Sequence, residues 1–367
     1  MNKNIVFFVS GLDSGGLENY LLRFLNEKCS SYNNIFVWCK GGSAGQLEEE
    51  YGKLPNVNIV KKKLSSFSLI PYVKLAYFIY KNDINVTCDF TGHFSAWVLL
   101  FSRLSGVKKR VASYRNSSNR YKESFLKNAY SNFLKIIVNN NATNIIANSD
   151  AGLDYFYTNH WKSDERFKVI RNGINPSDFI GEYKDLRREF GIPTDAFVIG
   201  HTGRFNEAKN HATIMAVAEV LLQKHQDIYF ILCGNGVLKN IQHSATVEQF
   251  RNRFLLFENR NDIPCFLNTM DCFFFPSITE GQPNSLIEAM VVGLPHVVSN
   301  IPSVQETIGQ SQKSYPPTDV ISLANALEQL YFEKPKLNLN VRYETIRRFD
   351  YKLRFEEFHI ELNGLDS

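Results

Sequence analysis

Short apolar stretches alternate with longer amphipathic ones along the first 150 residues of the chain. The apolar stretches have the length of buried strands, and the amphipathic ones carry apolar residues at helical spacing. Strands are predicted at residues 4–10, 35–39, 57–60, 86–90, 110–113 and 144–148, and helices at 69–80 and 95–104. This alternation predicts an α/β domain with a parallel sheet, whose active residues collect at the carboxyl ends of the strands.

A second alternating region begins near residue 196. Strands are predicted at 196–200, 228–232 and 254–257, and helices from near 210, at 321–330 and at 341–362. Between them, residues 271–300 have the pattern of a strand (271–276), a polar loop, a helix (285–292) and a strand (296–299). In such a unit, the loop and the helix N-terminus form a pocket suited to anionic ligands.

Length and composition indicate two α/β domains of a soluble globular protein, because 367 residues exceed one simple core and only 21% are charged. No apolar run reaches the roughly 18 to 20 residues of a membrane-spanning helix, and the N-terminus leads directly into a strand. The protein is therefore expected in the cytoplasm. The six cysteines show no CxxC spacing, so we expect them to be free and reduced.

Charge is distributed unevenly. Residues 1–140 carry 19 Lys and Arg against 9 Asp and Glu, whereas the remainder carries 22 against 28. The basic first part predicts an anionic partner, which could be a membrane surface, a diphosphate-linked acceptor or nucleic acid.

Residues 119–139 are predicted to form one long helix. Its inward positions are expected to be Phe125, Ala129, Phe133, Ile136 and Ile137, and its polar positions include Arg120, Lys122, Lys127 and Lys135. These cations make either a solvated face or, with Lys61–Lys63 and Lys108–Arg110, a surface for anionic lipid headgroups. The sequence leaves both interpretations open.

Two carboxylates mark the loop and helix of the 271–300 segment. Glu280 lies on the loop and Glu288 is expected in the first helical turn, where both could accept hydrogen bonds from ligand hydroxyls. Alternatively, Ser285 and Glu288 form a capping box, in which Glu288 only satisfies a backbone donor.

Arg204 and Lys209 lie between a predicted strand end and a helix N-terminus. There they could neutralise a diphosphate that would otherwise need a metal ion, although a single lysine is more often plain surface charge. The sequence contains no Asp-x-Asp and no His/Cys spacing typical of zinc, so no catalytic metal and no cofactor are expected.

The stretch PSITEGQPNSLIEAMVVGLP, residues 276–295, closely resembles the donor-site signature of the family-four retaining glycosyltransferases with the GT-B fold, the type found in capsule, O-antigen and exopolysaccharide synthesis. The resemblance implies that Glu280 contacts the donor sugar and that Glu288 holds the ribose hydroxyls. It also implies that backbone amides around Gly281, Asn284, Ser285 and Leu286 meet the sugar and diphosphate.

Other segments carry the same resemblance. They are Gly15, Gly16 and Glu18 in a glycine loop; a histidine, His93, after a strand; Gly203, Arg204, Lys209 and Asn210; the CGNGVL turn with Asn235; the Arg260–Asp262 segment; and Glu306. Similar enzymes place the glycines beside the substrate cleft, the histidine near the donor sugar, the two cations at the diphosphate, and the residues around Arg260 and Asp262 beside the base. The glycines do not form GxGxxG, so a tight turn without a ligand stays an alternative for Gly15 and Gly16.

The fold that this resemblance implies has two Rossmann-like domains facing a central cleft, with a C-terminal helix crossing back to the first domain. The expected divisions are 1–173 for the acceptor domain, 174–340 for the nucleotide-sugar domain and 341–367 for the returning helix. The chain would move a hexose or hexosamine from a nucleotide diphosphate sugar, with UDP as the expected nucleotide, to a glycan or undecaprenyl-diphosphate-linked acceptor. It would work at the inner face of the cell membrane and would not bind nucleic acid.

Rival interpretations remain. A non-catalytic relative would bind nucleotide sugar as a scaffold, and another GT-B-like enzyme would be an epimerase or a phosphorylase. Glu280, Glu288, Arg204 and Lys209 argue against the scaffold, and no pyridoxal-binding lysine of a phosphorylase can be identified.

Overall fold

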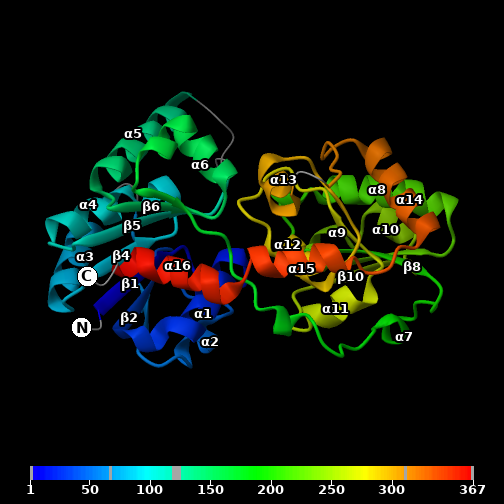
Figure 1. The fold of residues 1–367 in the computed structure, drawn as a ribbon, viewed down its shortest axis with the longest axis horizontal. Helices are drawn as coiled ribbons and strands as arrows, with labels where there is room; N and C mark the ends of the chain where they lie inside the picture. Colours follow the sequence, from blue (N-terminus) through cyan, green and yellow to red (C-terminus); the bar gives the residue numbers. More distant parts are fainter. Residues whose placement is uncertain (1–2, 66–67, 118–124, 310–311, 365–367) are drawn as a thin grey trace. The chain divides into compact units, whose positions relative to one another are not determined.

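The chain forms two units in the computed structural model, which describes residues 3–65, 68–117, 125–309 and 312–364 (Figure 1). Unit 1 comprises Met1–Gly173 and Tyr351–Ser367, and unit 2 comprises Ile174–Asp350. Each unit is described by itself.

Unit 1 contains a parallel sheet with the strand order β3-β2-β1-β4-β5-β6-β7. Its strands are β1 (Lys3–Val9), β2 (Tyr32–Cys39), β3 (Val57–Lys61), β4 (Val86–Asp89), β5 (Lys109–Tyr114), β6 (Asn144–Ala147) and β7 (Phe167–Val169). Its helices include α1 (Gly16–Lys28), α2 (Glu48–Gly52), α3 (Ile70–Lys81), α4 (Ala96–Leu104), α5 (Phe125–Asn141), α6 (Asp150–Tyr157) and α16 (Tyr351–Asn363).

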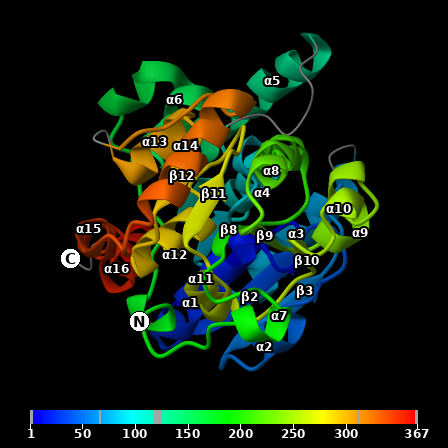
Figure 2. The ribbon, with the colours of Figure 1, turned by 90° about the vertical axis from the view of Figure 1, so that its right-hand side faces the viewer.

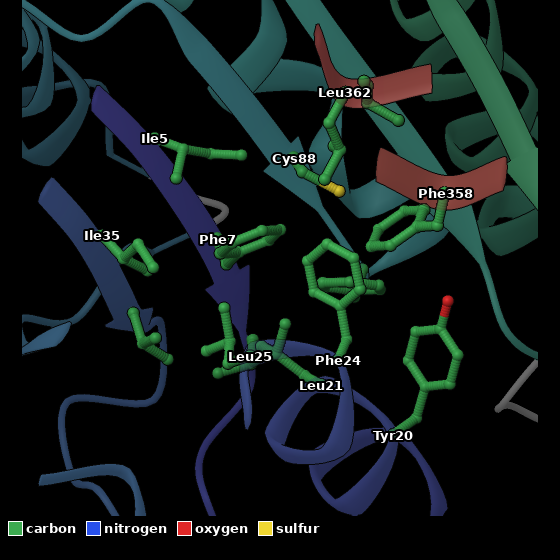
Figure 3. Packing of buried hydrophobic residues seen from close by; sticks show 14 of the residues in the cluster. Ile5, Phe7, Tyr20, Leu21, Phe24, Leu25, Ile35, Cys88, Phe358 and Leu362 are labelled. Atoms are coloured by element: carbon green, nitrogen blue, oxygen red, sulfur yellow. The ribbon is translucent and has the colours of Figure 1, made fainter. Parts of the chain in front are cut away.

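Both faces of this sheet are buried, because the side chains of β1 alternate between two apolar clusters. Ile5, Phe7 and Val9 pack with α1 and α16 on one face. Figure 3 shows Phe24 of α1 pointing toward Phe358 of α16, and their ring centroids are 4.8 Å apart. Val6 and Phe8 point to the other face, which α3 and α4 cover.

Unit 2 contains a second parallel sheet with the order β10-β9-β8-β11-β12. The strands are β8 (Phe197–Thr202), β9 (Ile228–Cys233), β10 (Phe254–Phe257), β11 (Cys272–Phe275) and β12 (His296–Val298). The helices include α7 (Arg187–Phe190), α8 (His211–Lys224), α9 (Val237–Ile241), α10 (Ala245–Gln249), α11 (Ile263–Thr269), α12 (Asn284–Val292), α13 (Pro302–Ile308), α14 (Val320–Glu333) and α15 (Leu339–Arg348). Helices α11 and α12 pack on one face of the sheet and α8 and α14 on the other (Figure 2).

Residues 341–362 do not form the single helical segment that their sequence predicts. Helix α15 ends at Arg348, and α16 begins at Tyr351. The division between the units falls between these two helices, so α15 belongs to unit 2 and α16 to unit 1.

The predicted orientation of the 119–139 helix is wrong. Helix α5 buries Ser131, Leu134, Val138 and Asn141. The side chains expected inside are mostly outside: Phe125, Phe133 and Ile136 are 86%, 49% and 60% exposed, Ala129 is exposed, and Ile137 is half-buried. The core selects the other face of the helix, since Leu134 and Val138 pack with Ala112 and Ile145 of the sheet. The N-terminal part of the expected helix, with Arg120 and Lys122, lies outside the described residues.

No helix in the described part of the chain combines the length and the apolar character needed to cross a membrane. All six cysteines are free, as expected, and all but Cys265 are buried.

Candidate active site

Most of the residues predicted to bind a donor lie at one edge of the sheet of unit 2. Gly203, Arg204 and Lys209 follow β8, and Asn235 follows β9. Glu280 and Gly281 follow β11 and precede α12. Because β8, β9 and β11 are parallel and adjacent, their carboxyl ends bring these loops together, at the edge where α/β folds bind ligands.

An ion pair joins two of these loops. Lys209 Nζ lies 2.7 Å from Glu280 Oε1, and the two side chains are 15% and 14% exposed. The Lys209 ammonium also lies 4.6 Å from the centre of the Phe275 ring. Asn210 fixes the loop from behind, since its Nδ2 donates to the carbonyl oxygens of Pro276 at 3.0 Å and Pro317 at 2.8 Å.

The loops after β8 and β9 touch through their backbones. The Gly203 N–H donates to Cys233 O and the Phe205 N–H to Asn235 O, both at 2.9 Å. A Cβ at Gly234 would lie 2.0 Å from Gly203 O, so only glycine permits this approach. The contact holds the loop that carries Arg204 against the loop that carries Asn235.

Helix α12 does not start as a capping box. It begins at Asn284 with Pro283 as the N-cap, and no side chain caps it. Ser285 therefore lies inside the first turn, and Glu288 lies in the second turn, not the first as expected. Glu288 is half-buried. The capping interpretation fails, and the positive end of the helix dipole faces the loop that carries Glu280.

Buried hydroxyl groups at this edge were not singled out from the sequence. Ser277, after β11, and Ser299, after β12, are fully buried, and the Oγ atoms of both lack a hydrogen-bond partner among the described residues. The Oγ1 atom of Thr202, at the end of β8, and the Oγ atom of Ser285 are also buried and lack a hydrogen-bond partner among the described residues. Buried polar groups without partners are rare and suggest a ligand or water that would satisfy them. For Ser277 and Ser299, the only sequence signal is a hydroxyl residue shortly after an apolar strand.

Two histidines are held neutral beside Lys209. His201 is buried, and its Nδ1 lies 3.0 Å from Phe274 O, a carbonyl that can only accept, so this nitrogen carries the proton. Burial lowers the pKa of His201 well below its usual value, and His211 and Lys209 lower it further. Burial, with the charge of Lys209, lowers the pKa of His211 to about 4.

The segment expected beside the base contains a paired Arg260 and Asp262. The guanidinium donates Nε to Oδ1 at 2.8 Å and Nη2 to Oδ2 at 2.7 Å. Because these two side chains bond each other, the backbone of the segment is the group that could contact a nucleotide base. Glu258, which the sequence analysis missed, accepts from the Gly236 N–H at 2.6 Å and the Lys239 N–H at 3.0 Å, and so fixes the turn that contains Asn235.

Arg204 has a different environment from Lys209. It is exposed and makes no hydrogen bond or ion pair with the described residues. Its guanidinium is therefore available to an anion without breaking an existing contact.

Unit 1 contains the remaining predicted site residues. Gly15 is the N-cap of α1 and Gly16 its first residue, so both lie where β1 passes into a helix. His93 is buried in the turn after β4, with its ring centre 4.2 Å from that of Phe94. Lys40 fixes this turn, because its Nζ donates to Asp89 Oδ2 at 2.9 Å, Thr91 Oγ1 at 2.8 Å and Phe94 O at 3.0 Å.

Two further features of the chain lie outside this set. Within the described ranges, no three or more His, Cys, Asp or Glu side chains gather in a way that could hold a metal ion. A cavity of about 490 Å³ in unit 2 is lined by residues of β12, α14 and α15, including His296 and Glu344, and shares no residue with the predicted donor site.

Family models match both halves of the chain. The model described as glycosyltransferase family 4 matches residues 14–178, and the one described as glycosyl transferases group 1 matches residues 182–348. With two parallel-sheet units and the donor motif at the carboxyl edge of the second, these matches define a GT-B-type glycosyltransferase. The chain belongs to the family-4 and group-1 glycosyltransferases, and the fold class predicted from the sequence is confirmed.

Relatives and solved structures agree with this family. The chain is 26% identical over 308 residues to the putative glycosyltransferase EpsF of Bacillus subtilis, which covers 81% of this chain and 79% of that protein. It is 32% identical over 143 residues, 37% of each chain, to UDP-Gal:alpha-D-GlcNAc-diphosphoundecaprenol alpha-1,3-galactosyltransferase of Escherichia coli. The crystal structure of Anabaena Alr3699/HepE in complex with UDP-glucose has the same fold, with a TM-score of 0.78 over 99% of this chain and 100% of that one, at 19% identity.

Proposed function

We propose that the chain transfers a hexose or hexosamine from a UDP-sugar to an acceptor hydroxyl, with retention of the anomeric configuration. The observation that carries this proposal is the pairing of Lys209 with Glu280 at 2.7 Å, at the carboxyl edge of the sheet and beside the N-terminus of α12. This edge supplies cationic groups for a diphosphate and carboxylates for hydroxyl groups within one set of loops.

Each group has a role in this proposal. Arg204, Lys209 and the backbone amides near Gly281, Asn284, Ser285 and Leu286 stabilise the departing diphosphate as its negative charge develops. Glu288 accepts from the ribose hydroxyls, and Glu280 and His93 orient the sugar. Gly15, Gly16, Gly203 and Asn235 let the backbone approach the donor, and the Arg260–Asp262 segment borders the uracil.

The departing phosphate takes the acceptor proton on the same face of the sugar in this scheme, because no side chain is assigned as a base. The proposed transfer needs no metal ion, since Arg204 and Lys209 supply the positive charge. Transfer is therefore expected to persist in excess EDTA, and loss of activity that Mg²⁺ or Mn²⁺ restores would contradict this part.

The proposed acceptor is a glycan or an undecaprenyl-diphosphate-linked saccharide in bacterial surface polysaccharide synthesis, at the inner face of the cell membrane. The names of the similar proteins support this acceptor class, because one of them acts on a sugar carried by diphosphoundecaprenol.

Thermal unfolding with UDP, GDP, ADP and their sugars tests the donor site. A nucleotide at 100 times its dissociation constant should stabilise the protein by about 2.7 kcal/mol, and Glu288→Ala should abolish this effect. No response to any nucleotide would contradict the proposal. Release of UDP from UDP-sugar on prolonged incubation separates an enzyme from a binding scaffold, because a scaffold would release none.

A further inference from the structure

A shielded ion pair lies beside the turn of unit 1 that contains His93. Lys40 Nζ is 2.9 Å from Asp89 Oδ2, and the two side chains are 11% and 0% exposed. Lys40 follows β2 and Asp89 ends β4, and β1 lies between these two strands in the sheet. The lysine side chain therefore reaches across the end of β1, over two strand spacings or about 10 Å. The pair links two strand ends that are not neighbours.

The hydrogen bonds of this pair form a closed set. An ammonium group has three N–H donors, and those of Lys40 meet Asp89 Oδ2, Thr91 Oγ1 at 2.8 Å and Phe94 O at 3.0 Å. Asp89 Oδ1 accepts from the Thr91 N–H at 2.9 Å and from the Thr91 hydroxyl at 2.6 Å. Since a fully satisfied polar network is rigid, it holds the turn from Asp89 to Phe94 in one conformation.

A gain in stability is a poor explanation for this pair. Taking two charges out of water is costly, and apolar side chains of similar volume often replace a buried ion pair without loss of stability. Apolar side chains are also what this part of unit 1 mostly buries, since Trp38, two residues before Lys40, packs with Phe8 of β1. The conformation that the pair imposes on the turn is therefore the more informative property.

The turn determines where His93 lies. Gly92 has a φ of +61°, and a Cβ there would lie 3.0 Å from the Tyr114 ring, so the turn approaches this ring as only glycine allows. The ring centre of His93 lies 4.2 Å from that of Phe94 and 5.8 Å from that of Phe156 in α6. Aromatic contacts thus orient the imidazole, while the ion pair fixes the backbone on both sides of it.

We propose that Lys40 and Asp89 are positioning residues for sugar transfer, which hold His93 in the orientation that transfer requires without touching the substrate themselves. This inference rests on the proposed function, in which His93 orients the donor sugar. A misplacement of about 1 Å at such a group can slow a reaction about 100-fold. Loss of the pair should therefore slow the reaction but leave UDP binding intact, because the proposed UDP site lies in unit 2.

Release of UDP from a UDP-sugar, with isothermal titration of UDP, tests the proposal. The substrate is whichever of UDP-glucose, UDP-galactose, UDP-N-acetylglucosamine and UDP-N-acetylgalactosamine the wild type cleaves fastest. Lys40→Met with Asp89→Asn removes both charges together, so no uncompensated charge stays buried. This double variant should keep the wild-type circular dichroism and the wild-type affinity for UDP, and should release UDP about 10- to 100-fold more slowly.

A combination with His93→Ala distinguishes positioning from a general structural role. If the pair acts through His93, adding the double change to His93→Ala should slow UDP release by no more than about twofold further. Losses that multiply in the combined variant would overturn the proposal, and so would a double variant that releases UDP as fast as the wild type. If the double variant does not fold, Thr91→Val decides, because it removes only one hydroxyl of the network. It should slow UDP release about fivefold, but not in the His93→Ala background.

Arg187→Met provides the matched control. Arg187 lies 2.7 Å from Asp271, is 15% exposed, and belongs to an ion pair just before β11, in unit 2. Its loss should lower the stability of the protein but leave UDP release unchanged, and an equal slowing in this variant would contradict a specific role for Lys40 and Asp89. A wild-type rate in His93→Ala would also overturn the inference, whereas a wild type that cleaves none of the four UDP-sugars contradicts the proposed function itself.

Discussion

The Nζ atom of Lys209 lies 2.7 Å from Oε1 of Glu280, and both side chains are largely shielded from solvent. The group proposed to meet the diphosphate and the group proposed to meet the sugar thus neutralise each other. Changing Glu280 leaves the shielded Lys209 ammonium without this ion pair. This coupling predicts that two changes at the same ion pair differ in their effect on nucleotide binding.

Glu280→Gln should leave UDP binding unchanged or make it tighter, because the diphosphate then no longer competes with a carboxylate for Lys209. The same change should slow sugar transfer by about 100-fold, if Glu280 orients the sugar. Isothermal titration with UDP and a transfer assay give the two values.

Lys209→Met should weaken UDP binding and slow transfer together, by about 100- to 1000-fold in rate, because a charge that stabilises the departing group is lost. The same titration and assay apply. If Glu280→Gln weakens UDP binding as much as Lys209→Met does, the competition between carboxylate and diphosphate does not exist.

Arg204→Ala should weaken UDP binding without lowering the stability of the protein. Since Arg204 is exposed and has no partner among the described residues, its loss should change the free energy of unfolding by no more than about 0.5 kcal/mol. The stabilisation by UDP, measured by thermal unfolding, should fall clearly. Arg251, also exposed on unit 2, provides the control, because Arg251→Ala should leave the effect of UDP intact. An equal loss in both variants would indicate general attraction by positive charge.

Gly234→Ala should destabilise unit 2 by about 2 kcal/mol or more, because its Cβ would lie 2.0 Å from Gly203 O and force the two loops apart. It should also weaken UDP binding. Gly52→Ala is the matched change, since no atom lies within 4 Å of the added Cβ, and it should be neutral or slightly stabilising. Denaturant unfolding of the two variants compares them, and equal stabilities would contradict the close packing of the loops.

Acid should destabilise the protein through His211. Its pKa of about 4 in the folded chain lies below the usual 6.5, so between these values the unfolded chain binds the additional proton. The free energy of unfolding should then fall as pH decreases from 6.5 to 4, by about 1.4 kcal/mol per unit from this residue. His211→Asn should reduce that slope in denaturant unfolding at several pH values. A slope that is the same in both proteins would contradict a neutral, buried His211.

Most strands were predictable because they are compact apolar runs, as in residues 272–275, and parallel sheets bury both faces. The three-residue strand β7 was not predicted. The orientation of α5 was not predictable from the sequence. Periodicity shows that Phe133 and Ile136 share a face of the helix, but it does not show whether that face packs against the core or is exposed. The start of α12 differs by one residue from the expected one, and this difference removed the capping box and moved Glu288 to the second turn.

The donor motif named Glu280 directly, but it could not reveal its partner. Lys209 is 71 residues away, and only the adjacency of β8 and β11 brings the two together. The unpaired hydroxyls of Ser277 and Ser299 were missed for a related reason. Serine after a strand is common, and only burial without a hydrogen-bond partner distinguishes these two.

The position of α16 in the sequence affects the order in which the two units fold during synthesis. Phe355 and Phe358 complete the apolar cluster around Phe24, yet they follow the whole of unit 2 in the chain. Unit 1, most of which the ribosome makes first, therefore cannot complete its core until α16 has been made, after the whole of unit 2. Unit 2 can finish folding while unit 1 still exposes the apolar side chains that α16 will cover, so chaperone dependence and aggregation during synthesis should concentrate in unit 1.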